Sequence, residues 1–221
     1  MKYYVVALII SFSGLVYLQS TRPQVKLADQ IVFDFNEQFA SYSSDTLRIS
    51  TFGYARAASS TLWLRFLQHT PPKKVEKNQV SWIYLDLLAV SELDPEFYFT
   101  YEFGGIFLSV ITEDKLGAER ILLKGIERFP DKWRLRAYLA YHYLFEVNEP
   151  EKAGEQFYQA AKLPGAPPLM AIRASSFLDK SGMTKEGIEL LKEMYASSED
   201  PKVKEKFLAK LKSFGVNINE K

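Results

Sequence analysis

Apolar and small residues recur along this chain in sets of three, spaced by four and then three positions. The four sets are Ile83/Leu87/Val90, Ala118/Leu122/Gly125, Ala153/Phe157/Ala160 and Gly187/Leu191/Met194. Successive sets are offset by 35, 35 and 34 residues. Residues with this spacing lie on one face of a helix, so each set predicts a helix with one packed face.

A proline follows each predicted helix, and a second helical stretch precedes it. The prolines are Pro95, Pro130, Pro164 and Pro201. Because the residue before a proline disfavours the α conformation, each helix should end shortly before its proline. Small residues at Gly104-Gly105, Ala140 and Ala174-Ser175 interrupt the preceding apolar stretches, where they would let two helix backbones approach closely. Each unit of about 34 residues is therefore predicted to be helix, turn, helix, proline.

This pattern resembles the tetratricopeptide repeat (TPR) family over residues 50 to 201. Leu93-Asp94-Pro95 and the stretch 161–168 also resemble a bacterial subgroup of TPR proteins with few assigned functions. The tryptophan that the family carries early in the first helix is missing, although Trp133 lies close by. The resemblance implies an all-α fold, a TPR-like α-solenoid of about three to four stacked helical hairpins with a C-terminal capping helix.

The repeat domain is predicted to span residues 50–215, followed by a tail at 216–221. Its degenerate first unit should begin with a helix from Ser50 to Gln68, whose packed stripe includes Phe52. The spacing of Val203, Phe207, Leu211 and Phe214 predicts a terminal helix that covers the open end of the stack. Residues 22–49 are expected to be a membrane-proximal linker, with a possible short helix. Polar and apolar residues alternate weakly from 30 to 35.

The chain carries no charged residue from Tyr3 to Thr21. A helix of that length would be about 28 Å long, close to the hydrocarbon thickness of a bilayer. Residues 1–21 are interpreted as a transmembrane signal anchor, with a cleaved signal peptide and a buried soluble helix as alternatives. With Lys2 retained inside, the repeat domain would lie on the extracytoplasmic side of the inner membrane. Membrane contact is therefore expected through residues 3–21, or export after signal cleavage.

Residues that could support catalysis are few. The chain has no cysteine, which excludes a disulfide framework, a thiolate metal site and a cysteine nucleophile. Its two histidines lack metal-ligand spacing: His69 is expected to cap a helix end, and His142 to be half-buried in a helix. No phosphate-binding glycine motif occurs, and a net charge of +1 disfavours nucleic-acid binding. We expect no enzymatic activity, cofactor or metal site.

Lysines are concentrated in two places: in the loop after residue 72, and beside the apolar stripe of the terminal helix. The simpler interpretation is a solvated surface, and attraction to anionic lipid headgroups is the alternative.

The expected functional surface is the concave side, which the first helices of the units should line. The candidate groove residues avoid the small-residue packing face and are Phe99, Glu102, Ile106, Tyr138, His142, Phe145, Ile172 and Ser176. The leading hypothesis is a scaffold or adaptor that holds a protein or peptide partner there. The alternative is an accessory subunit that binds a lipid or glycan in an aromatic-lined cleft, suggested by 13 Tyr and 16 Phe.

Overall fold

A computed structural model describes residues 13, 32–34, 48–68, 75, 78–180 and 182–217. These residues are mostly helical, which confirms the all-α expectation. Apart from Ser13, the expected membrane segment lies outside the described residues, and so does His69 with its expected capping role. Among the described residues, no helix has the length and apolar character needed to cross a membrane.

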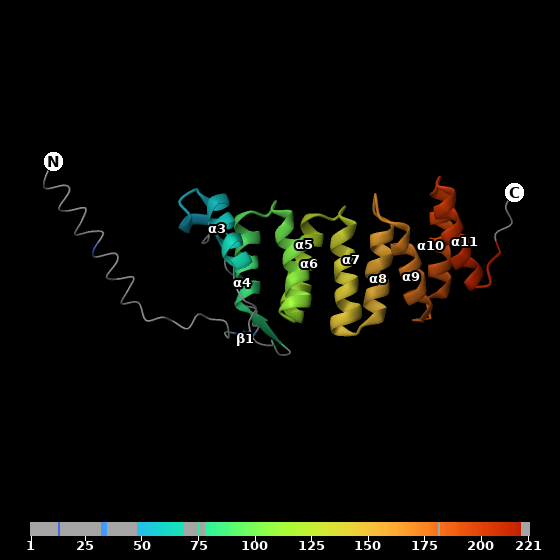
Figure 1. Cartoon of the computed structure of the whole chain (residues 1–221), viewed down its shortest axis with the longest axis horizontal. Coiled ribbons are helices and arrows are strands. Elements are labelled where there is room, and N and C mark those ends of the chain that lie inside the picture. The colour runs from blue at the N-terminus through green and yellow to red at the C-terminus, as the bar shows by residue number, and fades with distance from the viewer. Residues whose placement is uncertain are drawn as a thin grey trace.

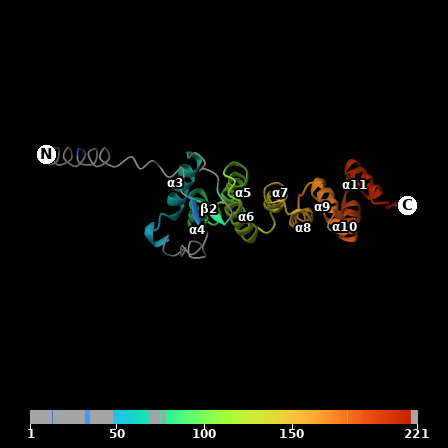
Figure 2. The same cartoon turned by 90° about the horizontal axis from the view of Figure 1, so that it is seen from below.

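The α-helices form one elongated row, as two perpendicular views show (Figures 1 and 2). They are α3 (Ala55–Gln68), α4 (Trp82–Leu93), α5 (Tyr98–Ile106), α6 (Lys115–Arg128), α7 (Trp133–Tyr141), α8 (Pro150–Ala161), α9 (Pro168–Lys180), α10 (Thr184–Ser197) and α11 (Pro201–Ser213). Helices adjacent in sequence pack against one another along the row. The core is therefore assembled from local contacts and runs the length of the row.

In two neighbouring hairpins, the first helix ends in a π-helical turn. Helix α5 continues into η2 (Phe107–Ile111), and α7 continues into η3 (His142–Val147). In η2 the backbone N–H of Thr112 donates to the Phe107 carbonyl at 3.1 Å, five residues back. Such turns are rare and occur frequently at functional sites. The two units therefore share the same local irregularity at starting positions that lie 35 residues apart.

Small residues bring the helices together, as the sequence predicts. Of the twelve residues in the four packing sets, all but Met194 are buried. A Cβ atom added to Gly125 of α6 would lie 2.6 Å from the Tyr101 Cβ atom of α5. One added to Gly105 of α5 would lie 2.6 Å from Leu122 of α6. The two helices of this hairpin are thus close enough to require glycine on both sides.

Asp114 links the N-terminal ends of α4 and α6, which are the second helices of two neighbouring hairpins. Its Oδ2 atom accepts hydrogen bonds from the backbone N–H and the hydroxyl of Ser81, at 2.6 and 2.7 Å. Its Oδ1 atom accepts from the Gly117 N–H at 2.8 Å, which caps α6. The Ser81 hydroxyl in turn accepts from the Tyr84 N–H and caps α4. Burial raises the pKa of Asp114, and the three bonds it accepts oppose that rise.

The first unit differs from the expected one at two points. Helix α3 begins at Ala55 rather than at Ser50, because Phe52 and Gly53 have left-handed backbone angles (φ 50° and 89°) that cannot continue an α-helix. Phe52, expected on the packed stripe, is instead exposed.

Within the expected linker, the structure places a strand. Strand β1 (Val32–Asp34) pairs antiparallel with β2 (Gln79–Ser81), with Phe33 opposite Val80. The weak alternation around residues 30 to 35 fits a strand period, but its partner lies 47 residues away in sequence and is not visible from the local pattern.

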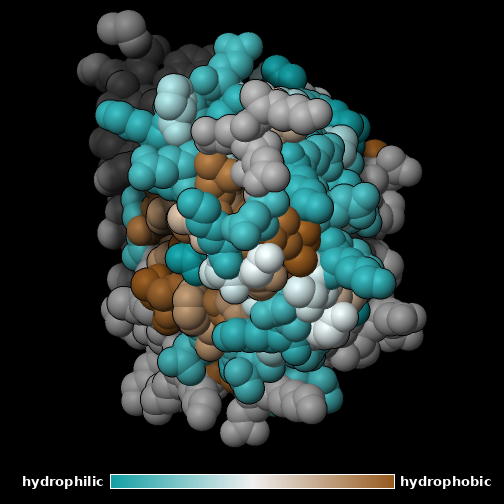
Figure 3. Space-filling model, turned by 90° about the vertical axis from the view of Figure 1, so that its right-hand side faces the viewer, coloured by the Kyte–Doolittle hydropathy of each residue, from teal (hydrophilic) through white to brown (hydrophobic). Residues whose placement is uncertain are grey.

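The C-terminal end of the row is covered by α11, as expected for the end of a helical stack. Phe207 and Leu211 of α11 are buried against α9 and α10. Seen end-on, this part of the surface is mainly hydrophilic, with apolar patches of limited size (Figure 3). A terminal helix with one apolar and one polar face explains this appearance.

We expect Gly125→Ala to lower the free energy of unfolding by about 1–2 kcal/mol. Overpacking against the fixed Tyr101 Cβ atom should outweigh the gain in helix propensity of about 1 kcal/mol. The control is Gly104→Ala, whose new methyl group meets the methyl ends of the Leu87 side chain, which can rotate. Urea unfolding measures both; equal stability of the two variants would contradict the close-approach explanation.

We expect Asp114→Asn to cost about 1–3 kcal/mol, because an amide has one acceptor oxygen and its NH₂ group would face a donor N–H. The control is Asp200→Asn, at the exposed cap of α11, where one oxygen accepts from the Lys202 N–H at 2.9 Å. Asparagine caps helices as well as aspartate does, so this variant should be nearly neutral. Thermal unfolding of the pair measures the difference, and similar losses would show that Asp114 acts as an ordinary cap.

Candidate functional site

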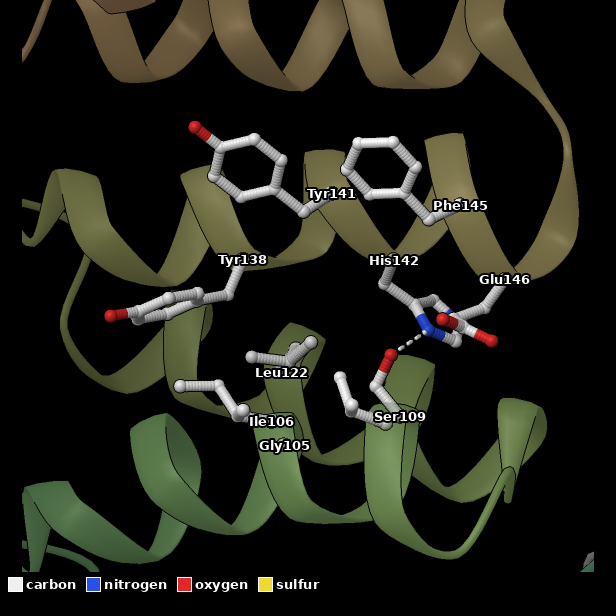
Figure 4. Close-up of a pocket in the computed structure, with 10 residues that line it drawn as sticks. Gly105, Ile106, Ser109, Leu122, Tyr138, Tyr141, His142, Phe145 and Glu146 are labelled. Atoms are coloured by element: carbon white, nitrogen blue, oxygen red, sulfur yellow. Dashed lines mark hydrogen bonds between the residues drawn. The ribbon is translucent and has the colours of Figure 1, made fainter.

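A small cleft lies between α5–η2 and α7–η3, and most of its lining is apolar or aromatic. It encloses about 80 Å³ and is lined by Gly105, Ile106, Ser109, Val110, Leu122, Tyr138, Tyr141, His142, Phe145 and Glu146 (Figure 4). In Figure 4, Tyr138 and His142 point toward Ile106, Leu122 and Ser109. For comparison, an apolar cavity of about 150 Å³ in another protein is large enough to hold benzene. The cleft therefore has room for one small apolar group.

Positions at the rim of the cleft recur in two successive units. Ile106 corresponds to Tyr141 and Val110 to Phe145, while Tyr138 corresponds to Phe103, which lies outside the cleft; each pair is 35 residues apart. Val110 is 60% exposed and Phe145 is 67% exposed. The Tyr141 and Phe145 rings lie nearly parallel, with centroids 6.1 Å apart. The repeat therefore presents apolar side chains to solvent at matching places, on the face formed by the first helices.

A buried polar pair joins the two π-helical turns beneath this rim. The Ser109 hydroxyl of η2 and Nδ1 of His142 in η3 lie 2.8 Å apart and form a hydrogen bond. Nε2 of the same ring is buried without a hydrogen bond of ordinary geometry. Burial lowers the pKa of His142, while the Glu119 carboxylate and the Lys115 backbone oppose the shift. The imidazole is thus neutral near pH 7 and links the two turns.

Nearby contacts hold η3 on α6. The Tyr143 hydroxyl donates to Glu119 Oε1 at 2.7 Å, and burial together with that carboxylate raises the pKa of Tyr143. The Lys115 ammonium group donates to the Glu146 backbone carbonyl. Three side-chain contacts therefore connect η3 to α6 and to η2, so the floor of the cleft is anchored on both sides.

The structure brings together four of the eight predicted groove residues: Ile106, Tyr138, His142 and Phe145. The other four lie outside this cleft. Glu102 is nearly buried, with its carboxylate 3.8 Å from the Arg134 guanidinium group, and Phe99 is exposed beside Tyr98.

The last two predicted residues lie on α9. Ile172 packs against the core, and the Ser176 hydroxyl donates to the Ile172 carbonyl at 2.9 Å, within the helix. His142, expected to be half-buried, is 2% exposed. The ring lies between η3 and η2, where it forms a hydrogen bond with the Ser109 hydroxyl.

The predicted groove set lacked six of the cleft residues: Gly105, Ser109, Val110, Leu122, Tyr141 and Glu146. Applying the period of 35 to the predicted Phe145 and Ile106 leads to Val110 and Tyr141, so the repeat contained a usable signal. Ser109 had no such signal, since its partner His142 is aligned with Phe107 in the repeat. Only the packing of η2 against η3 brings these two polar groups together.

Other buried ionisable groups in the described residues have structural partners. Asp86 accepts a hydrogen bond from Arg65 Nε at 2.9 Å, and Asp114 accepts the cap bonds described above. No group of three or more His, Cys, Asp or Glu residues in this part of the chain could hold a metal ion. A wider, open hollow lies on α8 and the turn between α9 and α10, where Glu151, Glu155 and Glu186 surround Leu178 and Met183.

Comparison of the chain with protein-family models, with curated proteins and with solved structures finds no match.

We expect the stability of the protein to fall as the pH decreases through 6.5, the ordinary pKa of histidine, toward the lower pKa of folded His142. In that window the unfolded chain binds a proton that the folded chain does not, so protonation favours unfolding. His142→Gln should remove this part of the pH dependence.

The control is His69→Gln, which changes the other histidine in the sequence. Unfolding midpoints between pH 8 and pH 5 measure the effect. If His142→Gln retains the full acid-side loss of the wild-type protein, the buried neutral imidazole is not its source.

Proposed function

We propose that this chain is a TPR-like α-solenoid that serves as a protein-interaction scaffold. Its hairpins are α3–α4, α5–α6, α7–α8 and α9–α10, with α11 as the cap. The regular period, the small residues at the helix contacts and the single row of helices support this architecture. In the proposed function, the face formed by the first helices holds a peptide segment of a partner protein.

The observation that supports this function best is the pair of matching apolar rims. Large apolar side chains exposed to solvent in a contiguous group mark interaction surfaces. Here Phe103 and Val110 in one unit and Phe145 in the next are exposed, and half-buried Tyr138 occupies the position that corresponds to Phe103. An extended segment that crosses both units would meet these groups at regular intervals, with one anchoring side chain in the cleft between them.

The size of the cleft favours a peptide anchor over a lipid or a glycan. Sites for small molecules usually enclose about 300–1,000 Å³. The cleft holds about 80 Å³, enough for one buried side chain. Contact surfaces typically gain most of their affinity from such central anchors surrounded by aromatic groups. The fixed Ser109–His142 floor would keep the cleft preformed, which lowers the entropic cost of binding.

The uncharged stretch from Tyr3 to Thr21 supports the second part of the proposal, a single-pass anchor in the inner membrane with the repeat domain outside the cytoplasm. Export after cleavage of this segment would place the same scaffold in the same compartment without a tether.

The test is photo-crosslinking in membranes from cells that produce the full chain. A benzophenone amino acid at position 145 should give a discrete protein adduct, because that side chain lies at the rim of the cleft. The same group at position 123 is the control, since Leu123 is an exposed apolar residue of the second helix α6 outside the cleft. Val110→Ala with Phe145→Ala should weaken binding of the identified partner at least about tenfold, a loss of about 1.4 kcal/mol.

Both alanine positions are more than half exposed, so the melting temperature should change little. Adducts of equal intensity from positions 145 and 123 would disprove a specific surface. An adduct with the mass of a lipid or glycan would instead support a ligand-binding subunit.

A further inference from the structure

The two ends of the row differ in how they are covered. Helix α11 covers the C-terminal end, whereas no described residue covers the outward side of α3 at the other end. The exposed positions of α3 are Arg56, Ala57, Ser60, Thr61, Leu64, Arg65, Leu67 and Gln68. Leu64 is 57% exposed and Leu67 is 51% exposed. Of the two arginines, Arg65 forms an ion pair with Asp86 of α4. The outward face of α3 thus combines Leu64 and Leu67 with small or uncharged polar side chains, and its charged residues are both arginines.

The residues just before α3 add further exposed apolar side chains. Ile49, Phe52 and Tyr54 are each more than 70% exposed, and the segment that contains them leads directly into α3, which lies at this end of the row (Figure 1). Monomeric soluble proteins rarely leave such groups of large apolar side chains in water. This end of the molecule is therefore suited to an apolar or interfacial environment.

The charge of this end has a single sign. Residues 48–68 contain Arg48, Arg56 and Arg65 but no aspartate or glutamate, although acidic and basic residues are nearly balanced in the whole chain. Arg48 and Arg56 are both exposed. Arginine and aromatic side chains beside aliphatic ones are typical of segments that lie in the interface of an anionic bilayer.

We propose that this end of the row, the outward face of α3 together with Ile49–Tyr54, rests on the surface of an anionic lipid bilayer. The apolar side chains enter the headgroup region, and Arg48 and Arg56 contact lipid phosphates. A second copy of the chain fits this face less well, because a two-fold contact brings like arginine-rich surfaces together.

Residues 22–47 separate the uncharged stretch from this surface, and residues 32–34 among them form strand β1. Attachment through the uncharged stretch depends on the proposed membrane anchor. The inference of a lipid-contacting surface depends only on the exposed residues 48–67.

The test uses the absence of cysteine in the chain, which allows single labelling sites in the full-length protein. Leu64→Cys and Leu67→Cys carry a fluorophore on the proposed surface, and Met183→Cys is the control at an exposed apolar position far along the row. Ser13→Cys reports separately on the uncharged stretch. Each protein is reconstituted into phosphatidylcholine–phosphatidylglycerol vesicles that contain doxyl-labelled lipid.

We expect the labels at 64 and 67 to be quenched several-fold more than the label at 183. Pure phosphatidylcholine, or Arg48→Gln with Arg56→Gln, should reduce quenching at 64 and 67 but not at 13. If the label at position 13 is quenched while the labels at 64 and 67 are quenched no more than the label at 183, the proposed lipid-facing surface is wrong and the anchor is supported. If 13 is not quenched, the anchor is wrong, and quenching at 64 and 67 still decides the surface. A label at 64 that is shielded from water without lipid quenching would show that protein covers α3 and would overturn the inference.

Discussion

The close approach of the two helices within a hairpin is the constraint on which the rest of this structure depends. Gly105 lies against Leu122, and Gly125 lies against Tyr101, at distances that leave no space for a Cβ atom. Because the backbones are so close, each first helix has a fixed height and rotation relative to its second helix. The same constraint acts in successive units, so outward-facing positions 35 residues apart present similar side chains to solvent.

The candidate site follows from this regularity and from one departure from it. Regular packing aligns Val110 with Phe145 at the rim, while the π-helical turns η2 and η3 change the direction of the residues between them. Ser109 and His142 meet as a consequence, in a buried pair that joins the two turns. A rigid polar floor beneath an apolar rim is an arrangement that can position one side chain of a partner without rearrangement.

The two proposed surfaces lie in different parts of the row. The cleft is formed by the second and third hairpins, whereas the apolar, arginine-containing surface is formed by α3 and the residues before it. A row that contacts lipid through α3 would keep the cleft away from the bilayer and open to a partner. The hydrophilic C-terminal end is consistent with exposure of that end to water (Figure 3).

The sequence by itself determined the all-α class and the positions of the packed helices, because helical periodicity and proline boundaries are local properties. The tertiary structure decided where α3 begins, since the left-handed Phe52 is not apparent from composition, and it paired β1 with a strand 47 residues away. It also decided which polar groups meet. Asp114 with Ser81, and Ser109 with His142, are each 33 residues apart, and only the packing of neighbouring hairpins brings such residues together.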